Sequence, residues 1–201
     1  MVTTPAETVR EPQQERSRLT RQRLLEATID CLGEHSWAGT TVAVVAERAG
    51  VSRGAAQHHF RTREELVTAA VQQVASLRGE EIRAADLPAG RQRTEEVLDL
   101  LARHFTSPIF TAALHLWVAA STDEQLREIV APLEAQVGRE AHRFTVELLD
   151  ADETRPGVRE AIQATLDLLR GLGLANLLTD DSARRTRLLK EWAKYLDGVF
   201  G

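Results

Sequence analysis

Apolar side chains recur along the first third of the chain with the three-to-four-residue period of an α-helix. The pattern predicts a helix over residues 18–39 and two short helices over residues 42–49 and 52–60, separated by Gly50. Residues 1–17 are polar and show no such period, so we expect a flexible arm there.

A longer helix is predicted to follow the two short ones. Thr62 and Glu65 have the spacing of a capping box, in which two side chains satisfy the first free amides of a helix. The segment 86–90 contains Pro88 and interrupts the helical pattern, which indicates a boundary between two parts of the chain.

The second part of the chain is also helical in pattern. Thr94 is predicted to cap one helix, and Pro108 to open the next in its first turn, where a missing N–H costs nothing. Residues 109–120 are apolar on nearly every side, so we expect them at the buried centre. A capping box at Ser121 is predicted to open a long helix that Pro132 kinks.

Two further helices are predicted after a loop over residues 150–157, and no segment alternates like a β-strand. The expected fold class is therefore all-α. It divides into the arm, a first helical unit over residues 18–80 and a second over residues 91–201.

Composition narrows the possible classes of protein. The single cysteine, Cys31, excludes an intramolecular disulfide and a cysteine-built zinc site. His104, His115 and His142 lack the spacing of a metal site, so we expect no metal and no cofactor. No apolar run approaches the roughly 18 residues of a membrane span, and the first residues do not form a signal peptide. We therefore expect no membrane partner and a cytoplasmic location.

Charge is unevenly distributed along the chain. Residues 10–63 carry a net charge of +3, whereas residues 94–201 carry −6. This split is compatible with a basic, nucleic-acid-facing end on an acidic body. A solvated charged surface would give the same numbers, so charge alone does not decide.

The two short helices and the turn between them have the pattern of a helix-turn-helix. Ala46 allows the helices to cross closely, Gly50 can adopt a left-handed conformation, and Val51 packs beneath them. The second short helix would then project its first turns into a DNA major groove about 12 Å wide.

The whole stretch from Thr40 to Leu66, TTVAVVAERAGVSRGAAQHHFRTREEL, resembles the DNA-binding domain of the tetracycline-repressor (TetR) family of bacterial regulators. The likeness covers about residues 18–70. It implies a homodimer whose two recognition helices read the halves of a near-palindromic operator in double-stranded DNA, and a second part that binds a small-molecule effector.

Several residues of this stretch have the chemistry that such an interface needs. Arg53 can present a two-pronged donor to a guanine edge, worth roughly 1–3 kcal/mol of discrimination. Gln57 replaces a tyrosine that the family usually has, and Ala43 makes base contact from the first short helix unexpected. Phe60 is expected in the core. The predicted DNA-binding residues are Thr41, Ser52, Arg53, Gly54, Ala55, Gln57, His58, His59 and Arg63.

The second part offers candidates for an effector pocket, although core packing is the alternative for each of them. A helical bundle with few polar groups suits an apolar or amphipathic effector. The candidates are Phe105, Phe110, His115, Trp117, Phe144 and Leu148.

The last two helices carry apolar stripes that a partner chain could cover. Two glycines in the first of them each cost about 1 kcal/mol relative to alanine, which close approach at a dimer contact would explain. The predicted dimer residues are Val158, Ile162, Leu166, Leu169, Gly171, Gly173, Leu188, Trp192, Tyr195 and Val199.

Two other classes of function remain possible from the sequence. A helical enzyme is disfavoured because no catalytic triad, phosphate-binding loop or paired-carboxylate motif is recognisable. A helical protein-interaction module without specific DNA binding is weakly favoured by Gln57 and the acidic net charge. The resemblance favours a ligand-responsive repressor, which is not an enzyme.

Overall fold

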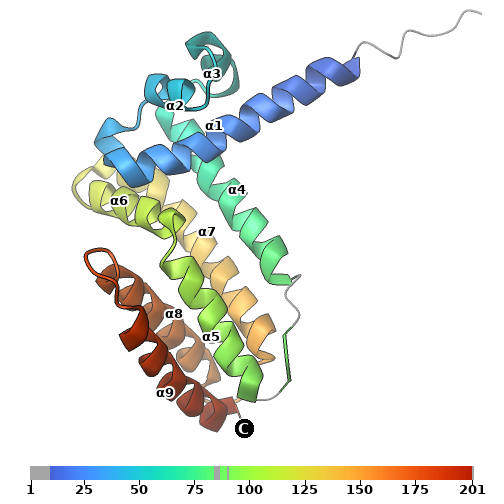
Figure 1. The fold of residues 1–201 in the computed structure, drawn as a ribbon, viewed down its shortest axis with the longest axis vertical. Helices are drawn as coiled ribbons and strands as arrows, with labels where there is room; N and C mark the ends of the chain where they lie inside the picture. Colours follow the sequence, from blue (N-terminus) through green and yellow to red (C-terminus); the bar gives the residue numbers. More distant parts are fainter. Residues whose placement is uncertain (1–9, 84–86, 90, 201) are drawn as a thin grey trace, which may run out of the picture.

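The computed structural model describes residues 10–83, 87–89 and 91–200, which form nine helices and no strand (Figure 1). This confirms the predicted all-α class. The helices are α1 (Arg10–Gly39), α2 (Val42–Arg48), α3 (Arg53–His59), α4 (Arg63–Arg83), α5 (Arg91–Phe105), α6 (Pro108–Thr122), α7 (Glu124–Leu149), α8 (Val158–Ala175) and α9 (Ser182–Phe200).

The first helix begins earlier than the sequence pattern predicted. It starts at Arg10, so residues 10–17 of the predicted arm are helical, while residues 1–9 lie outside the described residues. Glutamine, glutamate and arginine are strong helix formers even without an apolar stripe, and Glu15 pairs with Arg18 one turn later at 2.7 Å. As a result, the first turns of α1 extend beyond the rest of the molecule (Figure 1).

The end of α1 is bent at Ser36, whose backbone has φ 56° and ψ −174°. This conformation is rare for a residue with a side chain and breaks the helix before its last turn at Gly39. The Thr40 hydroxyl donates a hydrogen bond of 2.7 Å to the Ser36 carbonyl. The bend and this bond direct the chain into α2.

Two predicted helix caps are wrong. The cap of α7 is Asp123, whose carboxylate accepts from the Leu126 amide at 3.0 Å, because α6 continues through Ser121 to Thr122. Thr94 lies inside α5, where its buried hydroxyl donates to Asp197 at 2.7 Å and joins α5 to α9. The Thr94 hydroxyl therefore makes a contact between two helices, although its position in the sequence resembled that of a helix cap.

One continuous core crosses the predicted boundary between the two units. Leu24 and Leu66 of the first unit are fully buried and belong to the same cluster as Leu116 on α6 and Val130 on α7. At the other end of the molecule, α5, α8 and α9 pack together (Figure 1). Helix α7 runs through Pro132 without a break and contacts α4, α5, α6 and α8.

Candidate nucleic-acid interface and ligand pocket

The turn between α2 and α3 has the geometry of a helix C-cap closed by glycine. Gly50 has φ 66°, the Gly50 amide donates to the Glu47 carbonyl at 3.1 Å, and the Val51 amide donates to the Ala46 carbonyl at 3.0 Å. These two bonds satisfy the last carbonyls of α2. Ala46 is buried at the crossing, so the predicted helix-turn-helix is present.

Both short helices begin with a hydroxyl cap. The Thr41 hydroxyl accepts from the Val44 amide at 3.2 Å, and the Ser52 hydroxyl accepts from the Ala55 amide at 3.1 Å. A hydroxyl that accepts one hydrogen bond can still donate another. Thr41 and Ser52 are exposed, so each keeps a donor for an outside acceptor.

The outer face of α3 carries most of the predicted DNA-binding residues. Arg53, Gly54, Gln57 and His58 are exposed, whereas Ala55 and His59 are half-buried. The inner face of α3 packs through Ala56, and Phe60 follows in the core. Helices α2 and α3 together cap one end of the molecule (Figure 1).

The surroundings of His59 lower its affinity for a proton. Burial lowers the pKa of His59, and the nearby His58 and Arg21 lower it further. These surroundings favour the uncharged imidazole, which can meet a phosphate as a neutral hydrogen-bond donor.

Several arginines near the turn are engaged within the chain. Arg48 on α2 binds both carboxylate oxygens of Glu34 on α1, at 2.7 and 2.6 Å. The Arg63 guanidinium lies 3.7 Å from the centre of the Trp37 ring and donates to the Trp37 carbonyl at 3.2 Å. Arg53, by contrast, is exposed, and its side chain has no hydrogen bond or ion pair with any residue that the structure describes.

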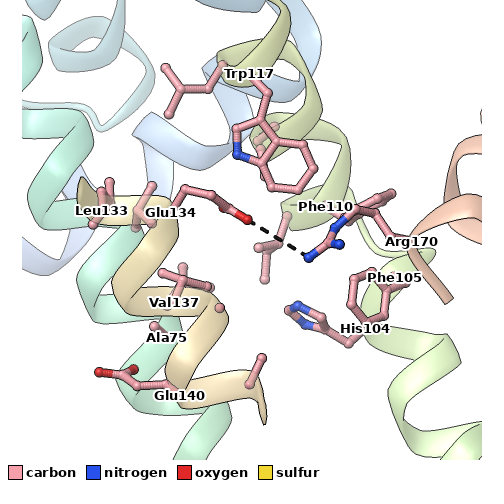
Figure 2. Close-up of a pocket in the computed structure, with 18 of the residues that line it drawn as sticks. Ala75, His104, Phe105, Phe110, Trp117, Leu133, Glu134, Val137, Glu140 and Arg170 are labelled. Carbon is pink, nitrogen blue, oxygen red and sulfur yellow. Dashed lines mark ion pairs between the residues drawn. The ribbon is translucent and has the colours of Figure 1, made fainter. Parts of the chain in front are cut away.

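A cavity of about 160 Å³ lies among α1, α4, α5, α6, α7 and α8 (Figure 2). Its wall is mostly aliphatic and aromatic, with four charged or polar side chains among the described residues: His104, Glu134, Glu140 and Arg170. Four of the six predicted ligand residues, Phe105, Phe110, Trp117 and Phe144, line it.

The other two predicted ligand residues do not line this cavity. His115 points towards α1, where its Nδ1 lies 2.8 Å from the Leu32 carbonyl oxygen. Because a carbonyl only accepts, Nδ1 carries the proton. Leu148 is buried in the cluster that joins α5, α7 and α8.

Sequence reasoning missed the charged residues of the pocket. Glu134 on α7 and Arg170 on α8 face each other across it, with 3.9 Å between the Arg170 Nη2 and the Glu134 Oε1 (Figure 2). Arg170 stands four residues after Leu166 on the same apolar stripe, which was the available signal. Its partner is 36 positions away on another helix, so spacing could not reveal the pair.

The pocket shifts the acidity of Glu134. Burial raises the pKa of its carboxyl group, while the charge of Arg170 and a hydrogen bond from the Trp117 side chain act in the opposite direction. The Arg170 guanidinium also lies 5.7 Å from the centre of the Trp117 ring. The lining of the cavity therefore brings together a carboxyl group, a guanidinium and an indole.

Half of the predicted dimer residues are buried by their own chain, which corrects that assignment. Val158, Ile162, Leu166 and Leu169 lie in the core of the single chain, and none is more than 7% exposed. A Cβ atom on Gly173 would lie 2.2 Å from the Phe105 carbonyl oxygen, so the close approach is to α5. Helical periodicity identified a buried stripe but could not show which chain buries it.

The remaining predicted dimer residues lie at the surface. Gly171 has open space around it, and Leu188 and Tyr195 are 39% and 53% exposed. Trp192 is half-buried and stacks on Tyr195 with 4.8 Å between ring centres, and Val199 is also half-buried. The end of α8 and its connection to α9 add further exposed leucines: Leu174, Leu177 and Leu178.

Among the residues that the structure describes, no group of three potential ligands could hold a metal ion. No helix in this part of the chain has the length and apolar character required to cross a bilayer.

The comparisons with known proteins identify the family. Residues 24–70 match bacterial regulatory proteins of the tetR family. The HTH-type transcriptional regulator CymR of Pseudomonas putida is 33% identical over 187 residues, which cover 89% of this chain and 90% of that protein.

Solved structures share the fold. A transcriptional regulator from Pseudomonas aeruginosa PAO1 aligns with a TM-score of 0.68 and 23% identity, covering 96% of this chain and 97% of that one. The multidrug binding protein EbrR, complexed with proflavin, aligns with a TM-score of 0.57 and 23% identity over 88% and 99% of the two chains. The chain therefore belongs to the tetR family of DNA-binding bacterial transcriptional regulators.

Proposed function

We propose that the protein is a repressor that binds a near-palindromic operator as a homodimer and leaves it when a small apolar or amphipathic effector enters the pocket. One observation carries the link between the two sites. Ile29 and Leu32 of α1 and Val71 and Val74 of α4 line the pocket. Helix α1 packs against α2, α3 and α4, and all four helices contribute to one buried cluster. An occupant would therefore contact the elements that position α3.

The neighbour EbrR, which is similar in fold, binds proflavin. That complex supports a ligand role for a cavity in this fold. It does not fix the ligand of this chain, because the lining side chains determine selectivity.

Base recognition is assigned to the exposed face of α3. Arg53 is free to present two parallel donors to a guanine, and Gln57, one turn later, can pair with an adenine or a phosphate. A Cβ atom on Gly54 would meet nothing within 4 Å, so the backbone can approach DNA closely there. Thr41, Ser52 and His58 are assigned to phosphate contacts, which position the protein without reading sequence.

The role of Arg53 is tested by fluorescence anisotropy on DNA from upstream of the protein's own gene and on scrambled DNA. Arg53→Ala is expected to weaken binding to the specific site by about 1–3 kcal/mol and to change binding to scrambled DNA much less. Arg187→Ala, an exposed arginine on α9, is the matched control and is expected to leave both unchanged. Equal losses on both DNAs for Arg53→Ala would assign Arg53 to phosphate instead.

The dimer contact is assigned to the exposed apolar residues of α8, α9 and their connection. Leu178 is 93% exposed, and Tyr195 and Leu188 project from α9. A second copy would remove this surface from water. Sedimentation velocity at micromolar concentration is expected to show a dimer for the native chain and for Lys190→Glu, and a monomer for Tyr195→Glu. A native monomer would overturn the assignment.

A further inference from the structure

Arg170 is the only arginine that lines the pocket, and one edge of its guanidinium lacks a hydrogen-bond partner among the described residues. Its Nη1 binds Asp167 one turn earlier. Its Nη2 is 3.9 Å from Glu134, which is too long for a hydrogen bond. Its Nε is buried without any partner in the part of the chain that the structure describes. The Nε–Nη2 edge therefore makes no hydrogen bond with the described residues, and its one charged contact among them is the 3.9 Å ion pair of Nη2 with Glu134.

An unsatisfied buried donor is costly, and the geometry of this one selects its partner. Two parallel N–H groups on one edge of a guanidinium match the two oxygens of a carboxylate. A neutral carbonyl would satisfy only part of the edge, and a cation would be repelled by it.

The rest of the pocket sets the size and character of the ligand. Its volume of about 160 Å³ is close to that of an apolar cavity of roughly 150 Å³ that holds one benzene ring. Phe105 and Phe110 meet edge to face at 5.3 Å, and Phe110 and Trp117 do so at 6.0 Å. This wall presents ring edges and faces to an aromatic guest.

The acidic groups near Arg170 are consistent with an anionic guest. Glu134 points towards Arg170 and has the Trp117 side chain as a hydrogen-bond partner, whereas Glu140, which also lines the cavity, directs its carboxylate away from Arg170 (Figure 2). Burial raises the pKa of the Glu134 carboxyl group, so this group takes up a proton more readily than a carboxyl group in water when a second carboxylate lies nearby. His104 on α5 is on the same side of the pocket (Figure 2).

We propose that the effector is an aromatic monocarboxylate of about one ring, whose carboxylate binds the Nε–Nη2 edge of Arg170 and whose ring lies among Phe105, Phe110 and Trp117. This inference rests on the proposed function, because it assigns the chemical class of that effector. Glu134 acts as a selectivity residue that limits the affinity for the anion.

Isothermal titration calorimetry with benzoate, benzamide and benzylamine tests this assignment, because the three probes share a shape and differ in charge. Benzoate is expected to bind at least about tenfold more tightly than either of the others. Arg170→Gln is expected to abolish this preference, and Arg170→Lys, which keeps the charge but loses the two-pronged edge, to reduce it. Glu134→Gln is expected to strengthen benzoate binding, and Arg187→Gln to change nothing.

Other outcomes would overturn the inference. If benzylamine bound most tightly of the three probes, and if Glu134→Gln abolished this binding, the pocket would be a cation site. Equal binding of benzoate and benzamide, or no binding of any probe, would remove the role of Arg170. If circular dichroism shows that Arg170→Gln does not fold, the role of Arg170 is judged from the three probes on the native chain and on Arg170→Lys.

Operator binding is measured separately, so that the two proposals fail in different ways. Benzoate binding by a chain that has no specific operator would refute the proposed repressor function and leave the ligand class standing. A specific operator together with no preference for benzoate would refute the ligand class alone.

Discussion

Substituting alanine for each of the two glycines of α8 is expected to have opposite effects on stability. A Cβ atom on Gly173 would lie 2.2 Å from the Phe105 carbonyl oxygen and 2.7 Å from the Phe110 ring. A Cβ atom on Gly171, half a turn away, would meet nothing within 4 Å. Gly173→Ala and Gly171→Ala therefore form a matched pair on one helix.

The expected magnitudes follow from packing and helix propensity. Replacing glycine by alanine inside a helix gains up to about 1 kcal/mol. Overpacking a core costs typically about 1–3 kcal/mol, and the cost is near the upper end where the obstacle is backbone. We expect Gly173→Ala to lose about 2 kcal/mol and Gly171→Ala to gain about 0.5–1 kcal/mol.

Thermal unfolding followed by circular dichroism measures both variants. In a chain of this length, 1 kcal/mol corresponds to about 2–4 °C, so Tm is expected to fall by about 4–8 °C for Gly173→Ala and to rise by a few degrees for Gly171→Ala. Since Phe105 and Phe110 line the pocket, Gly173→Ala is also expected to weaken ligand binding. An unchanged Tm for Gly173→Ala would refute the close packing of α8 on α5.

Two further predictions concern the contacts that hold α1 to α4, through Arg63, and to α2, through Arg48. Arg63→Ala is expected to lower the free energy of unfolding in urea by about 1–2 kcal/mol, because it removes the stacking on Trp37. Arg63→Lys is expected to retain part of the lost stability. An unchanged free energy of unfolding for Arg63→Ala would contradict the stacked geometry. The hydrogen bonds from Arg48 hold the pKa of Glu34 below its ordinary value of 4.5, so this pair stabilises the fold above that pH and the stabilisation is lost as the pH falls through the folded pKa. Glu34→Gln is expected to lower stability at neutral pH and to weaken its acid dependence, and an unchanged pH profile of unfolding would contradict it.

The helix-turn-helix could be predicted from sequence because its signals are local. Gly50, the caps Thr41 and Ser52 and the box of Thr62 and Glu65 act within four residues of where they stand. The structure contains each of these features. The capping box differs only in one hydrogen bond, because the Glu65 carboxylate accepts from the Arg61 amide at 2.8 Å and not from the amide of Thr62.

The pocket and the dimer surface were predicted less well because they depend on contacts between distant helices. Periodicity shows that Phe110 and Leu148 are both buried, but not that only Phe110 faces a cavity. A close approach at a dimer contact was predicted for Gly171 and Gly173, but it occurs only at Gly173, where the neighbour is Phe105 of the same chain. The start of α1 was missed because its first turns have no buried face.

Selection of binding sites from a library of randomised DNA duplexes tests sequence-specific DNA binding most directly. The native chain is expected to enrich an inverted repeat that still binds in the presence of excess scrambled DNA, and Arg53→Ala is expected to lose that enrichment. No enriched sequence, or the same repeat enriched by Arg53→Ala, would contradict sequence recognition through α3.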